Sequence, residues 1–339
     1  MTATILVLIV FMLLVFVVPL TKLGITRRRK LRAARDSIQP AIRASNEKFT
    51  HPLGTDSVTN ISVLIENHRD QNLTELVAEH GLSLHVESQG KALLFDTGSS
   101  GAAVRNARWM DIPLRSVDAV VISHGHRDHG GVLEAFFEVN DRAPVYLGTG
   151  AVVERFSPLF WFRKIPIGLN KRIVEANRDR FHFVESTTTI GEGLSVITDL
   201  SGTHPAPLDR GTLLKRQNGQ LVADDFTDEI ALVIQDLDGL VVLSGCGHNG
   251  VLNLLDRVKG LFPEVPIKAV LGGFHLMNPR LVEMSESRAE IERLGQKLLD
   301  SGVQRFVTGH CTGVEAYVVL KSVMKDRLEY LSTGSRLEI

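Results

Sequence analysis

Three histidines and one carboxylate lie within six residues of the stretch SHGHRDHGG at 123–131. This stretch directly follows the apolar run DAVVIS at 118–123, which predicts a strand, and it leads into a predicted helix at 131–139. Imidazole and carboxylate groups are ligands that Zn²⁺ and other borderline divalent metals prefer. One histidine near a strand end is more often structural, but a cluster of this kind is not. The candidate metal ligands, whose spacing fits two adjacent metals better than one, are His124, His126, Asp128 and His129.

The elements that must position this loop are predicted from hydrophobic periodicity. Apolar runs predict strands at 61–65, 82–86, 92–95, 118–123, 194–199, 230–235 and 240–244. Helical patterns cover 131–139, 251–259, 283–299 and 314–324. Two strand-rich blocks with helices between and after them favour an α/β sandwich, in which two sheets pack back to back and helices lie outside.

Composition narrows the class of protein. The 339 residues are 44% hydrophobic and 23% charged, which is typical of a folded globular chain of one large or two average domains. The 38 basic residues are balanced by 39 acidic ones, so no nucleic-acid partner is expected and a nuclease is disfavoured. Two cysteines, Cys246 and Cys311, exclude a disulfide-stapled secreted scaffold.

The N-terminus carries an apolar segment. No charged side chain occurs before Lys22, and residues 5–18 form an unbroken apolar run followed by a cluster of arginines at 27–35. This pattern predicts a single transmembrane helix at 1–21 that contacts membrane lipid, with the rest of the chain in the cytoplasm. Residues 22–58 are predicted to be a basic juxtamembrane segment and linker, with the arginines along the anionic leaflet. A cleaved export signal and a buried core helix are the alternatives.

Together with Phe95-Asp96-Thr97-Gly98, the histidine motif resembles the signature of the metallo-β-lactamase superfamily. Four further short motifs occur in chain order around the histidine motif: EHGLS at 79–83, SGCGHNG at 244–250, GGFHL at 272–276 and GHCTG at 309–313. They are similar to the branch that includes 7,8-dihydropterin-6-methyl-4-(β-D-ribofuranosyl)aminobenzene-5′-phosphate synthase. The resemblance covers roughly residues 60–335 and implies an αβ/βα four-layer sandwich with a metal site at the edges of the sheets. The catalytic domain is therefore expected at 59–339, and the transmembrane helix and linker lie outside the resemblance.

The resemblance also implies a ligand set for two divalent metal ions, with Zn²⁺ as the first choice and Mn²⁺ or Fe as alternatives. His124 and His126 would bind the first metal, whereas Asp128 and His129 would bind the second with His310. His248 would either complete the first site or bridge the two metals. Common hydrolases of the superfamily have an aspartate where this chain has Ser244-Gly245-Cys246. Either a Cys246 thiolate replaces that bridging carboxylate, or Cys246 is an inert buried thiol. A Cys246–Cys311 disulfide is disfavoured in a reducing cytoplasm.

Other residues are candidates for roles around the metals. Asp96 is expected to orient a ligating histidine, and Asp128 and His275 are the candidates for a catalytic role. His204 is expected to face the cleft, or even to ligate metal, or else to be structural. Asn67 and His80 are expected either to lie near the site or to form local hydrogen bonds. The basic and aromatic stretch at 155–172 would cap the cleft, lie on the membrane or pack on the surface, and its cations, Arg155, Arg163, Lys164, Lys171 and Arg172, would suit an anionic substrate.

The expected activity follows from the ligand set. A metal-activated water attacking an ester or phosphoester of a small-molecule substrate is the most direct chemistry of such a centre. Metal-assisted transfer on a pterin pyrophosphate is the alternative that the narrower resemblance implies. An anchored protein that binds metal or ligand without turnover is the third hypothesis.

Overall fold

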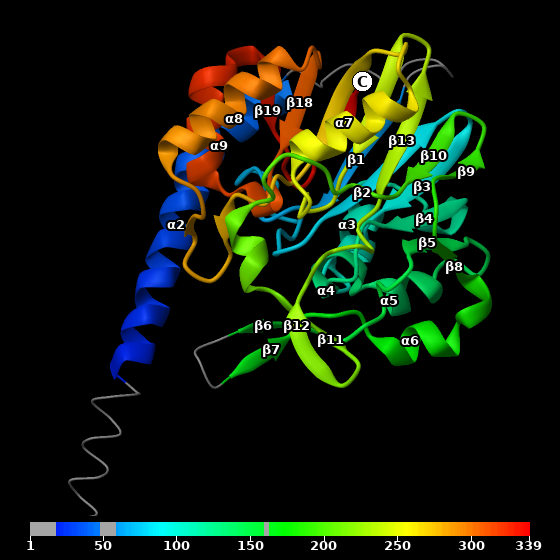
Figure 1. The fold of residues 1–339 in the computed structure, drawn as a ribbon, viewed down its shortest axis with the longest axis horizontal. Helices are drawn as coiled ribbons and strands as arrows, with labels where there is room; N and C mark the ends of the chain where they lie inside the picture. The colour runs from blue at the N-terminus through cyan, green and yellow to red at the C-terminus, as the bar shows by residue number, and fades with distance from the viewer. Residues whose placement is uncertain (1–17, 48–58, 159–162) are drawn as a thin grey trace, which may run out of the picture.

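The computed structural model describes residues 18–47, 59–158 and 163–339, and two seven-stranded sheets form its centre (Figure 1). The first sheet has the order β20-β1-β2-β3-β4-β5-β8 and the second the order β19-β18-β15-β14-β13-β10-β9. The strands of the first sheet are β1 (Asn60–Ile65), β2 (Ser83–Ser88), β3 (Lys91–Phe95), β4 (Ala119–Ile122), β5 (Val145–Gly148), β8 (Phe181–Val184) and β20 (Arg336–Glu338). Those of the second are β9 (Thr188–Gly191), β10 (Leu194–Ile197), β13 (Ala231–Asp236), β14 (Gly239–Leu243), β15 (Ile267–Gly272), β18 (Arg305–Thr308) and β19 (Leu328–Tyr330).

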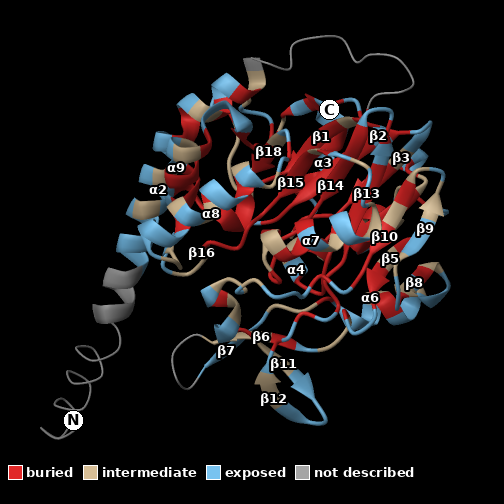
Figure 2. Ribbon diagram, turned by 45° about the horizontal axis from the view of Figure 1, so that its top comes forward, coloured by how far each residue is buried: buried red, intermediate tan, exposed pale blue. Residues whose placement is uncertain are grey.

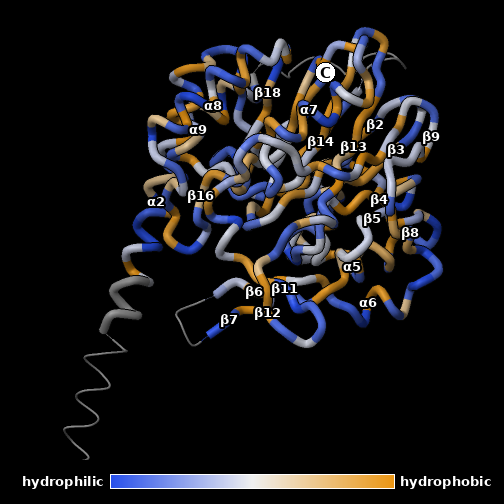
Figure 3. The backbone as a smooth tube through the Cα atoms, viewed as in Figure 1, coloured by the Kyte–Doolittle hydropathy of each residue, from blue (hydrophilic) through white to orange (hydrophobic). Residues whose placement is uncertain are grey.

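Alternation of side chains along these strands creates three apolar layers. In β4, Ala119 and Val121 face the core between the sheets, whereas Val120 and Ile122 face the helices outside the first sheet. In β14, Val241 and Leu243 likewise face the inter-sheet core. Because both faces of each sheet are covered, the central strands are apolar on both sides (Figures 2 and 3).

Helices cover the outer face of each sheet, so the described chain has the αβ/βα four-layer arrangement that the sequence predicts. Over the first sheet lie α3 (Ala102–Trp109), α4 (Arg127–Gly130), α5 (Leu133–Phe137) and α6 (Lys171–Ala176). Over the second lie α2 (Val18–Glu47), α7 (Val251–Leu261), α8 (Arg288–Asp300) and α9 (Val314–Met324). Short 3-10 turns occur at η2 (Leu114–Ser116), η3 (Arg178–Arg180), η4 (Leu208–Thr212), η5 (His310–Thr312) and η6 (Lys325–Arg327).

Two small sheets lie outside the layers, and the sequence did not predict them. One has the order β12-β11-β6-β7 and the other is the hairpin β16-β17. Their strands are β6 (Arg155–Pro158), β7 (Lys164–Pro166), β11 (Leu214–Gln217), β12 (Gln220–Ala223), β16 (Met277–Asn278) and β17 (Glu283–Met284). Part of the basic and aromatic stretch at 155–172 therefore forms β6, β7 and the start of α6, while residues 159–162 lie outside the described chain.

Helix α2 corrects the expected linker. Residues 36–47 belong to this helix, with Pro40 inside it, and Ile38 and Ile42 are buried in the core beneath α9. The four-residue spacing of these isoleucines places both on one face, a signal that Pro40 masked in the sequence. None of the described helices is long and apolar enough to cross a membrane. Most of the transmembrane helix predicted at 1–21 lies outside the described residues.

Candidate metal centre

The candidate ligands and the catalytic candidate His275 lie at one edge of the two sheets. His124 and His126 follow β4, His248 follows β14, His275 follows β15 and His310 follows β18. Strands β14, β15 and β18 are parallel neighbours, so the loops at their carboxyl ends meet at the same edge. The topology thus brings together residues that are separated by more than 180 positions in the sequence, such as His129 and His310.

Three of the site residues have left-handed backbone, with φ of 57° at Asp96, 51° at His275 and 49° at His310. This region is unfavourable for residues other than glycine and is populated mainly where surrounding structure imposes it. Each of the three follows a buried strand, so the sharp change of direction lets the chain leave the strand and turn its side chain toward the site.

The first ligand group contains His124, His126 and His248, whose donor atoms lie within 4.8 Å of one another. The Nε2 atoms of His124 and His248 are 3.2 Å apart, and the buried Nε2 of His126 has no hydrogen-bond partner among the described residues. Burial, reinforced by neighbouring imidazoles, lowers the pKa of all three histidines well below the usual value. Neutral imidazoles with buried, converging nitrogens form a set of lone pairs suited to a cation.

The second group contains Asp128, His129 and His310. The Nε2 atoms of His129 and His310 are 3.1 Å apart, and Asp128 Oδ2 lies 3.8 and 3.5 Å from them, respectively. Asp96 Oδ2 lies 2.6 Å from His129 Nδ1, and Asn67 Oδ1 lies 3.0 Å from His310 Nδ1. These oxygens accept the Nδ1 protons, so both Nε2 lone pairs point toward the space beside Asp128. Asp96 thus lies where it can orient a ligating histidine, as the sequence predicts, and Asn67 lies near the site, which was one of its two expected positions, and orients His310.

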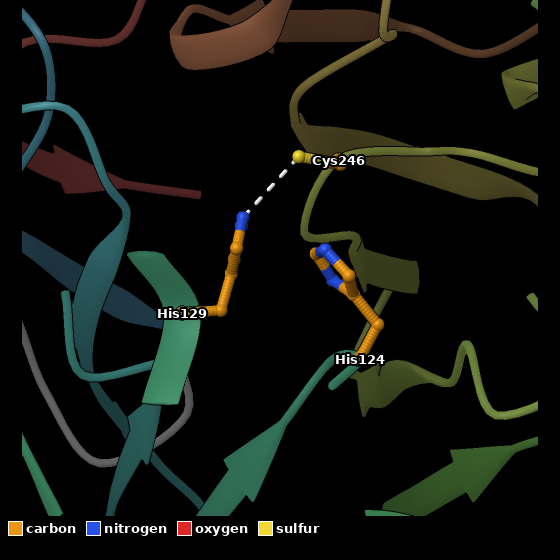
Figure 4. A group of neighbouring side chains, drawn as sticks. All are labelled: His124, His129 and Cys246. Carbon is orange, nitrogen blue, oxygen red and sulfur yellow. Dashed lines mark hydrogen bonds between the residues drawn. The ribbon is translucent and has the colours of Figure 1, made fainter. Parts of the chain in front are cut away.

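Cys246 lies between the two groups. Its sulfur is 3.2 Å from His129 Nε2, and it lies within 4.8 Å of donor atoms of both His129 and His124 (Figure 4). Burial, followed by the effect of Cys311, raises the pKa of the Cys246 thiol well above its ordinary value. The two cysteines are free, and the Cys311 thiol donates to the Cys246 carbonyl oxygen at 3.1 Å. Cys246 is therefore placed where a ligand could bridge the two groups, and a metal would be needed to favour its thiolate.

Two buried glutamates that the sequence analysis missed hold the loops that carry His248 and His310. Glu229 accepts hydrogen bonds from the backbone N–H of His248 at 2.7 Å and of Asn249 at 2.8 Å. Glu66 accepts from the backbone N–H of His310 and of His68. Burial raises the pKa of both carboxyl groups, that of Glu66 to about 8, against the opposing effect of these donors. Their only sequence signal is a position next to a buried strand, β1 for Glu66 and β13 for Glu229.

Comparisons with known proteins agree with this geometry. A family model described as the metallo-beta-lactamase superfamily matches residues 78–207. A solved structure of a metal-dependent hydrolase of the β-lactamase superfamily is 31% identical, with a TM-score of 0.69, over 83% of this chain and 99% of its own. The chain belongs to the metallo-β-lactamase superfamily.

The chain is also similar to two further proteins. The 7,8-dihydropterin-6-methyl-4-(beta-D-ribofuranosyl)-aminobenzene-5′-phosphate synthase of Methanocaldococcus jannaschii is 29% identical over 82% of this chain and 96% of its own length. The Zn²⁺-bound PqqB of Methylobacterium extorquens is 14% identical over 83% of this chain and all of its own, with a TM-score of 0.54, and shares the fold. The superfamily is one of metal-dependent enzymes, and the two groups of His, Asp and Cys donors fit its two-metal centre.

The metal centre of this superfamily member opens into a cavity of about 240 Å³, here called the metal cavity. Its lining includes Asp128, His126, His248 and the second catalytic candidate, His275. Neither ring nitrogen of His275 has a hydrogen-bond partner among the described residues, and its Nε2 lies 4.0 Å from Asp209, a buried carboxyl group that the sequence analysis missed. Burial lowers the pKa of His275 to about 4 and raises that of Asp209. His275 is thus a neutral donor or acceptor in the wall of the metal cavity.

His80 and His204 have different surroundings. The half-exposed His80 contacts Asp128, with Nε2 3.2 Å from Oδ2, and lines the metal cavity. It therefore lies near the site, which was one of the two positions expected for it. His204 instead pairs with Asp256 of α7 at 3.0 Å, and it is absent from the described lining of that cavity. The structure therefore gives His204 a local surface contact and does not bring it to the ligand groups.

The stretch at 155–172 borders the metal cavity, but not through the cation Arg155, which was expected to suit an anionic substrate. Ser157 and Ile167 form part of its wall, so the stretch borders the cleft. Arg155, however, is buried and pairs with Asp224 at 2.8 Å and with Asp228 at 2.5 Å. Asp228 in turn accepts from the backbone N–H of Gly125 at 2.9 Å. Arg155 therefore supports the histidine loop from behind and is not a cation available to substrate.

Proposed function

We propose that this protein is a dinuclear metal-dependent hydrolase that acts on an ester or phosphoester of a small anionic molecule. The observation that carries this proposal is the convergence of six buried or partly buried donors into two groups, with imidazole nitrogens 3.1 and 3.2 Å apart. Imidazole nitrogens that converge this closely are suited to a shared cation, which would replace any proton held between them. Two divalent ions held there, Zn²⁺ first or Mn²⁺ or Fe, would activate a water and polarise the substrate oxygen.

The protein's own residues supply orientation and proton control. The carboxylate of Asp128 is the favoured form, because nearby His129, His310 and His80 hold its pKa well below the usual value despite burial. It therefore accepts hydrogen bonds and can orient an attacking water. His275 faces the same cavity with both ring nitrogens available, so it can donate a hydrogen bond to the departing oxygen.

The test combines metal content with turnover. We expect about two metals per chain by elemental analysis and hydrolysis of bis-4-nitrophenyl phosphate or 4-nitrophenyl acetate by the metal-loaded full chain. His124→Ala and His310→Ala should each lower metal content and abolish hydrolysis. His182→Ala is the matched control, because His182 is an exposed histidine on β8 stacked on Tyr146. Metal content below one per chain that neither variant changes would refute the proposal and favour the non-catalytic binding protein.

A second candidate function is metal-assisted transfer on a pterin pyrophosphate. The relative from Methanocaldococcus jannaschii, 29% identical and matched over 96% of its length, supports it. The two functions differ in the acceptor: water for the hydrolase, an arene or amine for the transferase. Incubating the metal-loaded chain with a dihydropterin pyrophosphate, with and without an aminobenzene acceptor, separates them by mass spectrometry of the products. Release of pyrophosphate that requires the acceptor would favour the transferase.

We also propose that residues 1–21 anchor the protein in the membrane with its catalytic domain in the cytoplasm. The support is the uncharged apolar run followed by basic residues at 27–35. Full-length protein should resist alkaline carbonate extraction from membranes. A reporter that works only in the cytoplasm should be active when fused after Ile339, and a reporter that works only outside the cytoplasm should be inactive there. Release of the protein by carbonate, or cleavage after the apolar run, would refute the anchor.

A further inference from the structure

A second cavity of about 560 Å³ lies next to the metal cavity, between α2 and the hairpin β16-β17. We call it the helix cavity. His80 and Pro279 line both cavities, and the candidate ligand His310 lines the helix cavity as well. The two spaces are therefore neighbours, divided by the side chains of His80 and Pro279.

The volumes of the two cavities indicate which of them can hold the body of a substrate. Small-molecule sites usually measure about 300–1,000 Å³. The metal cavity, at about 240 Å³, is below that range before any ion or water is placed in it, whereas the helix cavity lies within it. A larger space of about 740 Å³ lies beside β11 and α6, but it shares no described lining residue with the metal cavity. A substrate larger than its reacting group would therefore extend into the helix cavity.

The lining of the helix cavity is mainly apolar. The side chains come from three elements that enclose it: Leu31 and Ala34 of α2, Met277, Val282 and Met284 of the hairpin region, and Val314 of α9. Two of these residues are methionines, whose flexible thioethers adapt to ligands of varied shape. Such a lining favours a hydrocarbon or aromatic body over a sugar or a peptide backbone.

The charged side chains at the rim are mixed, with Arg27 and Lys30 beside Glu79, Glu283 and Glu315, so the ligand's own negative charge is expected on the reacting group at the metal cavity. Lys30 of α2 forms an ion pair with Glu283, which ties the helix to the hairpin. Glu79 already accepts from the backbone N–H of Ser99 at 3.0 Å and of Ser100 at 2.9 Å. Arg27 contacts the Pro279 carbonyl oxygen at 3.4 Å and pairs with no carboxylate among the described residues. Glu315, whose carboxylate accepts from the backbone N–H of Met284 at 3.4 Å, balances the charge of Arg27 at this rim, which leaves the apolar lining as the main feature of the cavity.

We propose that the helix cavity holds the apolar body of an amphipathic organic anion whose reacting group lies at the metals. This inference rests on the proposed hydrolase function and deepens it, because it names the substrate class. It also gives α2 a second role: the helix is a wall of the substrate site, contributed by residues that precede the two sheets.

The test uses alkylphosphonates, which are not hydrolysed, as probes of the metal-loaded full chain. Each fully buried methylene strengthens binding by about fourfold, so butylphosphonate should bind at least tenfold more tightly than methylphosphonate by titration calorimetry. Ala34→Phe, which fills the helix cavity from α2, should abolish this gain and leave methylphosphonate affinity unchanged. Ala44→Phe is the matched control, because Ala44 is an exposed alanine of the same helix, outside the described lining. Val282→Phe fills the cavity from the opposite wall and serves if Ala34→Phe lowers the melting temperature.

The outcomes separate this inference from the function on which it rests. Equal affinity for the two phosphonates, in a chain that hydrolyses 4-nitrophenyl esters, would overturn the inference and leave the hydrolase intact. A gain that survives in both Ala34→Phe and Val282→Phe would overturn it too. No binding and no hydrolysis would refute the hydrolase itself. Phosphatidic acid in phosphatidylcholine vesicles is the second arm: displacement of bound butylphosphonate supports a lipid source for the anion, and its failure supports a soluble one.

Discussion

Replacing Glu229 by glutamine tests whether the buried carboxylate fixes the metal-binding loop after β14. One oxygen of Glu229 accepts from the backbone N–H of His248 at 2.7 Å, and the other accepts from the backbone and side-chain N–H groups of Asn249, both at 2.8 Å. All three partners are donors. Glutamine offers one oxygen, so its NH₂ group must face at least one N–H in either orientation.

The best orientation keeps both Asn249 bonds and places the NH₂ group against His248 N–H. A buried donor left unpaired costs about 1–3 kcal/mol. Much of this cost is relieved by moving the loop, which displaces the His248 ring from its position 3.2 Å from His124. We therefore expect Glu229→Gln to weaken metal binding by about tenfold to a hundredfold, the range typical of lost supporting contacts.

The assay is competition with a chromophoric chelator for Zn²⁺, read alongside the melting temperature of the chelated protein. Glu185→Gln is the control, because Glu185 is an exposed glutamate at the end of β8. Zinc affinity and melting temperature equal to those of the unchanged protein would show that Glu229 does not hold the loop, and the reasoning from its three donors would fail.

Three further perturbations probe separate parts of the molecule. Asp96→Ala removes the oxygen that lies 2.6 Å from His129 Nδ1, so zinc affinity measured by chelator competition should fall by about tenfold to a hundredfold. Burial raises the pKa of Glu66 from 4.5 to about 8, so in chelated protein its stabilisation is complete below pH 4.5 and is lost as pH rises to about 8. Denaturant unfolding should reveal a loss of about 1.4 kcal/mol per pH unit in that window, and Glu66→Gln should flatten it. Ile42→Ala should destabilise the domain by about 2–5 kcal/mol in the same assay, because Ile42 is fully buried; an unchanged midpoint would mean that α2 does not pack on the core.

Hydrophobic periodicity predicts the buried strands, the β2–β3 hairpin and the amphipathic helices of this fold. The runs at 61–65 and 92–95 correspond to β1 and β3, and the helical pattern at 314–324 matches the bounds of α9. The hairpin between β2 and β3 turns at Gln89 and Gly90, both with positive φ. Strands such as β6 and β11 were missed because they are short and partly exposed, and because they pair with each other across about 60 residues, which no local pattern records.

The residues of the candidate site also fall into those that a local motif marks and those that only the fold brings together. The histidine motif marks itself by composition, since four potential ligands occur within six residues. Glu66, Asp209 and Glu229 carry no such mark, because each acts through groups that only the fold brings near it. Arg155 was predicted wrongly for the same reason. Its basic neighbours in the sequence predict an exposed anion site, whereas in the fold it is buried and paired with two aspartates about 70 positions away.

Removal of the metals should destabilise the fold, because the candidate ligands come from both sheets. In each group two ligands follow β4 of the first sheet and one follows a strand of the second, His248 after β14 or His310 after β18. Each metal would therefore join the two sheets at their edge and bind only the folded chain. Free metal at one hundred times its dissociation constant stabilises by about 2.7 kcal/mol per site. With an unfolding entropy of about 2.1 cal/mol/K per residue, this raises the melting temperature by about 4 °C per site. Chelation should therefore lower the melting temperature by about 8 °C in the unchanged protein and by about half as much in His310→Ala. An equal shift in both would mean that His310 does not hold a metal between the sheets.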